Sequence, residues 1–436
     1  MTVNKINIFW FRRDLRLEDN IGLFKALQGN LPVLPIFIFD TDILDELPAA
    51  DARVTFIFNK LQEIHKELKE IGSQLAVYHG NPTHVFEKLV SQFQIQNVYT
   101  NHDYEPYARA RDKTIKNILS KKEVNFYSFK DQVIFEKDEV VKADGNPYLV
   151  YTPYMKSWKN KFKNKYKPID YSLNKLKSNF HKYPKAPKVT LLQLGFKASK
   201  IEVPEYDISE GLIQNYEDNR NFPALNATSH VSPHLRFGTI SIRKLVEKAS
   251  SKNNEIFWQE LIWREFFMQV LWHFPETTHN AFKPKYDRII WRNNEAEFEK
   301  WKDGMTGYPL VDAGMRELKE TGFMHNRVRM VTASFLCKHL LIDWRWGEAY
   351  FAKHLLDYEM ASNIGNWQWA AGCGVDAAPY FRIFNPTSQL EKFDKDHKYI
   401  KKWLPEFGTT SYPEMMVDHK KARERCLTTY KSALSK

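Results

Sequence analysis

The sequence of 436 residues lacks the features that define several common protein classes. Its three cysteines, Cys337, Cys373 and Cys426, lie far apart and form no Cys-x-x-Cys pair, which argues against a disulfide framework or a zinc cluster. No apolar run reaches the roughly 18 residues that a membrane-spanning helix needs. Residues 1–11 lack the long apolar stretch of a secretory signal. We therefore expect a cytoplasmic protein without membrane segments.

Common catalytic and cofactor motifs are also missing. The sequence contains no Gly-x-Gly-x-x-Gly, no P-loop, no His-Glu-x-x-His, no Gly-x-Ser-x-Gly and no EF-hand loop. Its fourteen histidines are scattered without the spacing of metal ligands, so no metal site is predicted. A dinucleotide bound at the first strand–helix turn and the usual hydrolase mechanisms are therefore not supported.

Two quantities are high. Lysine plus arginine exceed aspartate plus glutamate by 64 − 53 = 11, which suits a polyanionic partner, although solubility alone explains such an excess as well. Aromatic residues make up 14% of the chain, and ten of the twelve tryptophans lie between Trp258 and Trp403. Tryptophan is mostly buried, so the cluster first indicates a packed core.

The first 130 residues alternate strand and helix patterns. This alternation predicts an α/β domain with a Rossmann-like parallel sheet and helices on both faces. The expected strands are residues 6–11, 33–39, 75–78, 97–100 and 124–129, and the expected helices are residues 52–71, 83–93 and 108–119.

Residues 131–203 are predicted to be an interdomain linker. Residues 156–188 contain eleven lysines and one acidic residue, and three prolines interrupt any long helix. The lysines suit either a solvated connection or an accessory strip that contacts phosphates. Residues 204–436 are predicted to form an all-α domain. Its expected helices are residues 240–250, 255–272, 308–320, 326–339 and 348–358.

Polar side chains lie among aromatic ones in this helical half. Residues three or four apart share a helix face, which places Glu260 beside Trp263 and Asn326 beside Met330. Trp367 and Trp369 flank Gln368 in a further aromatic segment. A carboxylate among tryptophans suits a cavity for a planar, partly polar group. Arg220, Arg327 and Arg382 lie in or beside these segments, and guanidinium groups bind phosphate bidentately. Core packing explains any single one of these aromatic residues, and surface ion pairs explain any single arginine, so the hypothesis depends on their co-occurrence.

Five stretches of the chain resemble motifs of the photolyase/cryptochrome family, most closely those of class I DNA photolyases that repair cyclobutane pyrimidine dimers. They are residues 9–20 (FWFRRDLRLEDN), 307–313 (GYPLVDA), 323–330 (FMHNRVRM), 367–371 (WQWAA) and 380–386 (YFRIFNP). The resemblance spans essentially the whole chain, and its C-terminal motifs are long and specific.

The resemblance implies that the helical domain binds FAD in a folded form. The matching positions are Tyr216, Thr228, Ser229, His230, Val231, Ser232, Arg264, Asn326, Arg329, Asp357, Glu359 and Asn363. Tyr216 and residues 228–232 correspond to the segment that holds the phosphates, and Asn363 corresponds to the residue near N5 of the flavin. His230 departs from the arginine, lysine or glutamine of many relatives.

The resemblance also implies the activity: light-driven repair of damaged DNA by electron transfer from excited, reduced FAD. Substrate contacts are implied for Glu260, Trp263, Asn326, Met330 and Trp369, and DNA backbone contacts for Arg220, Arg327 and Arg382. An electron relay to oxidised flavin is implied for Trp367, Trp344 and Trp291. Packing of a helical core is the simpler explanation for three tryptophans taken alone.

Three related functions stay open at this point. Six-four photolyases resemble this chain but carry histidine at the positions of Asn326 and Met330. Plant cryptochromes resemble it but have Asp at the position of Asn363 and Tyr at that of Trp369, and they carry a long C-terminal tail. DASH-type relatives typically have Gln where Met330 stands, although Phe323 and residues 357–359 are DASH-like.

A second, antenna chromophore is compatible with the resemblance, but its identity is not assigned. Folate-binding relatives have Asn-Glu where this chain has Tyr107 and Ala108, so a deazaflavin or flavin is favoured over folate. Arg53, Asp103, Asp40 and Arg236 resemble positions that line such a pocket. We expect the protein to act as a monomer on damaged DNA.

Overall fold

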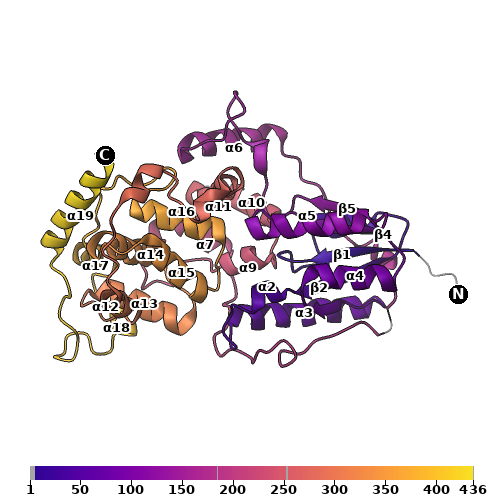
Figure 1. Ribbon diagram of the computed structural model, residues 1–436, viewed down its shortest axis with the longest axis horizontal. Coiled ribbons are helices and arrows are strands. Elements are labelled where there is room, and N and C mark those ends of the chain that lie inside the picture. The colour runs from indigo at the N-terminus through magenta and orange to yellow at the C-terminus, as the bar shows by residue number, and fades with distance from the viewer. Residues whose placement is uncertain (1–4, 184, 252–253, 436) are drawn as a thin grey trace. The chain divides into compact units, whose positions relative to one another are not determined.

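The computed structural model describes residues 5–183, 185–251 and 254–435 (Figure 1). Contacts divide the chain into two compact units. The first unit contains residues 1–136, 161–205 and 231–248, and the second contains residues 137–160, 206–230 and 249–436. Both units are therefore assembled from separate parts of the sequence. The domain limits 1–130, 131–203 and 204–436 remain a prediction.

The first unit is built on a parallel sheet of five strands in the order β3-β2-β1-β4-β5. Its strands are β1 (Ile6–Phe11), β2 (Val33–Phe39), β3 (Ala76–His79), β4 (Ile95–Asn101) and β5 (Asn125–Phe129). The predicted α/β fold with a Rossmann-like parallel sheet is confirmed, and each expected strand is present within two residues of its predicted limits.

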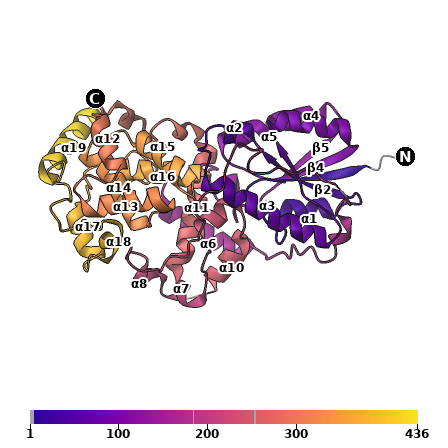
Figure 2. The same cartoon turned by 90° about the horizontal axis from the view of Figure 1, so that it is seen from below.

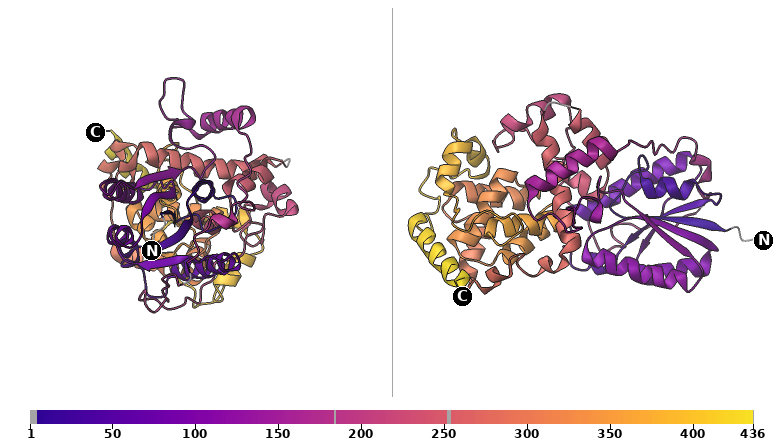
Figure 3. Two further views of the ribbon diagram at one scale, coloured as in Figure 1. Left: turned by 90° about the vertical axis from the view of Figure 1, so that its right-hand side faces the viewer. Right: turned by 90° about the horizontal axis from the view of Figure 1, so that it is seen from above.

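Helices cover both faces of this sheet (Figures 2 and 3). Phe9 and Phe11 pack with α1 (Ile21–Leu27) and α3 (Ala52–Glu70) on one face. Ile8 and Trp10 alternate with them and pack with α4 (Pro82–Gln92) and α5 (Pro106–Ser120) on the other face. Side chains of one strand alternate between faces, so a strand whose residues are all buried, such as β1, fits only a sheet covered on both sides.

The other helical segments of the first unit are short. They are α2 (Thr41–Leu44), the 3₁₀ turn Lys177–Asn179, α9 (Ser232–Phe237) and most of α10 (Ile242–Ser250). Side-chain caps define where several helices of this unit begin. Asn20, Asp51 and Asn81 each accept a hydrogen bond from a backbone N–H group in the first turn of α1, α3 and α4, respectively.

A buried carboxylate joins separate segments of the first unit. Asp131, whose side chain is 1% exposed, accepts hydrogen bonds at 2.8 Å from Arg16 and from Arg243. Arg243 also contacts Asp19 at 3.0 Å. Burial by itself raises the pKa of Asp131, but the charges of Arg16 and Arg243 outweigh it and the pKa is lowered.

The second unit is helical, as predicted for the C-terminal half. Its helices are α7 (Glu210–Gln214), α8 (Tyr216–Asn219), α11 (Glu255–His273), α12 (Glu295–Lys302), α13 (Pro309–Thr321), α14 (Asn326–Ser334), α15 (Trp344–His354), α16 (Met360–Ala371), α17 (Pro386–Phe393), α18 (Lys398–Trp403) and α19 (His419–Leu434). Short 3₁₀ turns lie at Lys137–Glu139, Pro275–Thr278 and Pro284–Arg288. The main core of the unit includes Trp301, Trp344 and Trp367, and all three cysteines are buried as free thiols.

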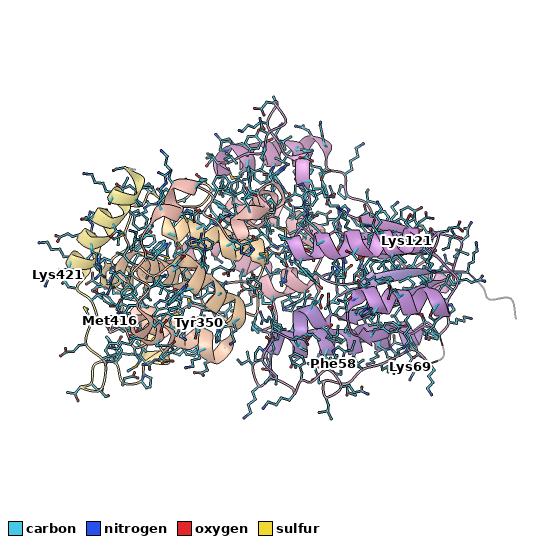
Figure 4. The ribbon with its side chains drawn as sticks, viewed as in Figure 1. Phe58, Lys69, Lys121, Tyr350, Met416 and Lys421 are labelled. Atoms are coloured by element: carbon cyan, nitrogen blue, oxygen red, sulfur yellow. The ribbon has the colours of Figure 1, made fainter. Side chains whose placement is uncertain are left out.

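Both units expose lysine side chains on their surfaces. Lys69 and Lys121 in the first unit and Lys421 in the second are exposed, while Tyr350 on α15 packs against the core of the second unit (Figure 4). No helix in the described parts of the chain is long and apolar enough to span a membrane.

Two sequence-based expectations about helix limits are wrong, and one segment contains a helix that the sequence did not indicate. The segment predicted to be a linker includes the fifteen-residue helix α6 (Tyr151–Lys165), and Pro168, Pro184 and Pro187 all follow it. The helix expected over 326–339 changes to a π-helical turn at Phe335–His339. The helix expected over 348–358 begins at Trp344, where Asp343 caps it, and ends at His354.

We predict that Asp131→Asn destabilises the protein by about 3–5 kcal/mol, because it leaves Arg16 and Arg243 buried without their carboxylate. The wild-type contribution is present above the ordinary pKa of 3.8 and is lost as the pH falls through the lowered value in the folded protein. Denaturant unfolding at pH 7 and below pH 4 tests both statements. Equal stability of mutant and wild type at pH 7 would contradict the prediction.

Candidate active site

Three helices of the second unit carry ten of the predicted site residues. Helix α11 contributes Glu260, Trp263 and Arg264. Helix α14 begins within the motif of residues 323–330, and α16 ends with the motif of residues 367–371. Helix α11 packs against α8 and α16, and α16 also packs against α14. Residues that are up to 150 positions apart in the sequence are therefore brought into one helical bundle.

Glu260 forms an ion pair with Arg220, with 2.5 Å between Oε1 and Nη1. The side chains are 36% and 20% exposed, respectively, so the pair lies at the surface of the bundle. The guanidinium of Arg220 also lies 5.3 Å from the ring centroid of Tyr216, one turn earlier on α8. Arg220, a predicted DNA ligand, therefore contacts both Glu260, a predicted substrate ligand, and Tyr216, a predicted cofactor residue.

Trp263 has a stacking partner that the sequence analysis missed. The ring of Tyr151, at the start of α6, lies parallel to it at 3.6 Å between centroids and 8° between planes. The Tyr151 hydroxyl donates to the carbonyl of Gln259 at 2.8 Å, and its backbone N–H donates to Asp376 at 3.0 Å. Tyr151 therefore fixes the orientation of the indole. No motif signals this contact, because it depends on where α6 packs.

Helix α14 begins at Asn326, which is exposed, and Met330 follows one turn later with its side chain half-buried. Arg327 between them donates to the Asn221 side chain at 2.6 Å and stacks over the Phe393 ring at 4.3 Å. The Asn221 amide and the Phe393 ring are both uncharged, so these contacts leave the charge of the guanidinium available for an anion. The third predicted DNA ligand, Arg382, is exposed.

His325 caps α14 and is 4% exposed. Its Nδ1 accepts the backbone N–H of Arg327 at 3.2 Å, so a neutral ring carries its proton on Nε2. Burial and the charges of Arg329, Arg327 and Arg220 lower the pKa of His325 to about 4. The imidazole is therefore neutral at physiological pH.

Two ion pairs connect the helices of the bundle at predicted cofactor positions. Arg329 contacts Asp357 through two hydrogen bonds of 3.1 and 3.0 Å, in the bidentate arrangement that suits a carboxylate. Arg264 contacts Glu359 at 2.9 Å, and Glu359 precedes the first residue of α16. These pairs fix the loop before α16 to α11 and α14.

Asn363 is buried on α16, and its side-chain amide donates to the Glu348 carboxylate at 2.9 Å. Burial raises the pKa of Glu348, and the hydrogen bond from Asn363 opposes that rise. Glu348 was not identified from the sequence, because its contact with Asn363 depends on how α15 packs against α16.

The predicted phosphate segment crosses from the second unit into the first. Thr228, Ser229 and His230 belong to the second unit, whereas Val231 and Ser232, at the start of α9, belong to the first. His230 adopts a φ of 49°, which is uncommon for a residue other than glycine. Its Nε2 contacts the Asn226 side chain at 3.3 Å, and its ring lies 4.9 Å from that of Phe323.

The tryptophans of the predicted relay differ in burial. Trp367 and Trp344 are each 2% exposed, and Trp291 is half-buried, with its ring 6.0 Å from that of Tyr430. Gly347 lies against Trp367, since a Cβ added there would come within 2.1 Å of the indole. Trp369 on the same helix is half-buried, and its ring lies 6.5 Å from that of Phe384.

Of the positions that resemble an antenna pocket, Asp40 and Asp103 lie beyond the carboxyl ends of strands in the first unit, whereas Arg53 lies in the first turn of α3 and Arg236 on α9. Asp40 follows β2 and accepts a hydrogen bond from Tyr107 at 2.7 Å. Asp103 follows β4 and pairs with Arg13 at 3.2 Å. The crevice at the carboxyl ends of parallel strands is the usual ligand site of such sheets. Among the residues described, no three His, Cys, Asp or Glu side chains converge as metal ligands.

Two family models match the chain. The model for DNA photolyase matches residues 7–172, and the model for the FAD binding domain of DNA photolyase matches residues 257–411. The chain belongs to the DNA photolyase family. It is 38% identical to a deoxyribodipyrimidine photo-lyase from Synechococcus, over 94% of this chain and 93% of the relative. The enzymatic assignment follows from many relatives of that name that match nearly the full length.

Solved structures give the same family. A class III photolyase from Agrobacterium tumefaciens has a TM-score of 0.85 at 34% identity and covers 99% of this chain and 98% of its own. An archaeal photolyase from Sulfolobus tokodaii, solved with two FAD molecules, has a TM-score of 0.82 at 34% identity, covering 98% and 99%. A Synechocystis cryptochrome has a TM-score of 0.86 at 24% identity, covering 98% and 100%, which shows the shared fold.

The residues present in the second unit fit FAD. The Nδ1 atom of His230 and the Nε2 atom of His325 are buried, and neither has a hydrogen-bond partner within the described structure. Buried polar atoms are normally paired, so these two atoms suit a polar ligand. The guanidinium group of Arg329 is close enough to lower the pKa of His325, and Arg264 and Asn363 on the packed helices α11 and α16 add further polar donors of the kind that a flavin nucleotide requires.

We predict that Asp357→Asn lowers both the FAD content and the stability, because the Arg329 guanidinium loses its bidentate partner. The expected cost is about 1–3 kcal/mol of unfolding free energy. Asp303→Asn is the matched control, since its pair with Lys319 is more than half exposed and is worth less than about 1 kcal/mol. Flavin absorbance per chain and thermal melting measure the two effects, and equal behaviour of both variants would refute the prediction.

Proposed function

We propose that this enzyme repairs cyclobutane pyrimidine dimers in DNA with light. The observation that best supports the proposal is the contact of Arg220 with Glu260, because it joins a phosphate-binding group to a carboxylate on the helix that also carries Trp263. When bound, reduced FAD would supply the electron that opens the dimer after absorbing blue or near-UV light. The residues of the second unit supply binding and orientation.

Substrate binding divides among three kinds of side chain. Arg220, Arg327 and Arg382 hold backbone phosphates on either side of the lesion. Trp263, fixed by Tyr151, and Trp369 offer aromatic faces to the dimer. Photolyases are known to extrude the damaged bases from the duplex, and a dimer that pairs poorly with its complement lowers the cost of that step.

Glu260 contributes electrostatics at the lesion. Its carboxyl group accepts hydrogen bonds from base-edge N–H groups and so orients the dimer within the site. Asn326 and Met330 lie one turn apart on α14 and complete the cavity wall. On the cofactor side, Arg264, Arg329, Asp357, Glu359 and Asn363 would hold the isoalloxazine end of FAD, and Tyr216 with residues 228–232 its phosphates.

The cyclobutane dimer is favoured over the six-four photoproduct as the substrate, because positions 326 and 330 carry no general acid. Six-four repair moves a group between bases and needs a general acid, whereas neither Asn326 nor Met330 titrates near neutral pH. His325 is the neighbouring imidazole, and its pKa of about 4 keeps it neutral at pH 7. It therefore offers a hydrogen-bond donor but no ready acid.

The second candidate function is that of a blue-light photoreceptor. The fold similarity to a cryptochrome favours it, although that similarity lies below 25% identity. The two functions differ in one observable respect, since a photoreceptor reduces its flavin in light without repairing DNA.

We further propose a flavin-type second chromophore at the carboxyl edge of the sheet in the first unit. Asp40, Tyr107, Asp103 and Arg13 gather polar groups there, and a relative from Sulfolobus tokodaii was solved with two FAD molecules. Chromatography of chromophores released by heat identifies the occupant.

We predict that Trp367→Phe reduces the photoreduction of oxidised FAD to a small fraction of the wild-type rate, because Trp367 would be the donor nearest the flavin. Trp403→Phe is the control, since Trp403 belongs to the same core but lies outside the predicted relay. Chemically pre-reduced Trp367→Phe enzyme should still repair DNA. Undiminished photoreduction in Trp367→Phe would show that another donor dominates.

The substrate assignment predicts light-dependent repair of cyclobutane dimers and negligible repair of six-four photoproducts by pre-reduced enzyme. Glu260→Ala should lower the repair yield per absorbed photon and leave FAD bound. Both lesions are offered under blue light and the products are separated by chromatography. Repair of six-four lesions alone would overturn the assignment, and repair of neither with intact photoreduction would establish the photoreceptor alternative.

A further inference from the structure

Arg220 differs from the other two predicted DNA ligands in its partner. Arg327 is held by a neutral amide and an aromatic ring, and Arg382 is exposed. The guanidinium of Arg220 instead contacts the carboxylate of Glu260 at 2.5 Å and lies over the Tyr216 ring. In the DNA-free protein, the residue expected to hold a phosphate and the residue expected to contact a base therefore neutralise each other.

This pair cannot persist unchanged when both residues act on DNA. A phosphate that takes the donors of Arg220 competes with Glu260 for the same fork of N–H groups. Glu260 is about one-third exposed, so the displaced carboxylate regains only part of its hydration. A partly buried anion without a hydrogen-bond partner costs free energy. Binding of a phosphate at Arg220 is therefore penalised unless a new donor reaches Glu260.

A dimer drawn into the site supplies that donor, because its base edges carry N–H groups. Undamaged DNA stacked within the duplex keeps these groups paired with the complementary strand and offers none. We propose that the Arg220–Glu260 ion pair is an interlock that couples backbone binding to base recognition and thereby weakens binding to undamaged DNA. This inference rests on the proposed function, in which Arg220 and Glu260 act separately on the backbone and on the bases. It adds that their contact contributes to the specificity for damaged DNA.

The interlock makes an unusual prediction for Glu260→Gln. Removal of the carboxylate frees Arg220, so the affinity for undamaged duplex should rise about three- to fivefold, the range expected for an ion pair worth up to about 1 kcal/mol. The affinity for dimer-containing duplex should fall or stay the same, because the amide reads the base edges less well. The ratio of the two affinities should therefore decrease at least about threefold.

Glu255→Gln is the matched control. Glu255 lies on the same helix, is exposed and pairs with Lys159 at 2.8 Å, so its replacement changes the net charge equally. It should raise the affinity for both duplexes by one common factor and leave the ratio unchanged. The measurement is equilibrium binding in the dark to labelled duplexes with and without a dimer, at fixed salt and with FAD-loaded protein. It gives the affinities of the wild type and of both variants for each duplex.

A double-mutant cycle isolates the pair. In the Arg220→Gln background, adding Glu260→Gln should raise the affinity for undamaged DNA only by the common factor that Glu255→Gln gives, because no guanidinium is left to release. A rise of the same size in both backgrounds, or a ratio for Glu260→Gln equal to that of Glu255→Gln, would overturn the interlock. Wild-type protein that binds both duplexes equally would instead contradict the proposed function, so the two failures are distinguishable.

Discussion

Charge compensation between segments determines the geometry of the helical unit around its candidate site. Arg220, Arg264 and Arg329 come from two helices and a helix end, and each meets a carboxylate from a different segment. Charged groups that lose water need such partners, since an unpaired one costs several kcal/mol. The pairs therefore hold α8, α11, α14 and the loop before α16 in one arrangement, and they do so at the positions where a flavin and a nucleic acid would bring further charge.

The first unit is organised by a different constraint, the burial of apolar strands on both faces. Short runs of apolar residues are local in the sequence, and for this reason the sequence predicted all five strands and the longer helices α3, α4 and α5, although not the short helices α1 and α2. The helical half was predicted less well. A π-helical turn at Phe335–His339 changes the period within one element, and helix α6 lies in a lysine-rich stretch whose packing residues, Tyr154 and Trp158, give a weak apolar pattern.

The candidate site shows the same division between local and non-local information. The motifs around Asn326 and Trp367 could be found because each is continuous in the sequence. Tyr151 and Glu348 could not, because each reaches its partner, Trp263 or Asn363, only after separate helices have packed. Hydrogen bonds and stacking contacts between distant helices leave no spacing in the sequence. The residue types at the site were therefore predictable, while the partners that orient them required the fold.

The burial of all three cysteines has a consequence for a protein that works under illumination. Excited flavins in air generate oxidants that attack exposed thiolates first. Here burial raises the pKa of Cys373 to about 12 and that of Cys426 to about 11, and Cys337 shifts in the same direction. The sulfur atoms thus stay protonated and shielded from the solvent. The three cysteines therefore offer no easily oxidised surface thiol, so disulfide cross-linking between copies of the folded protein is not expected during prolonged illumination.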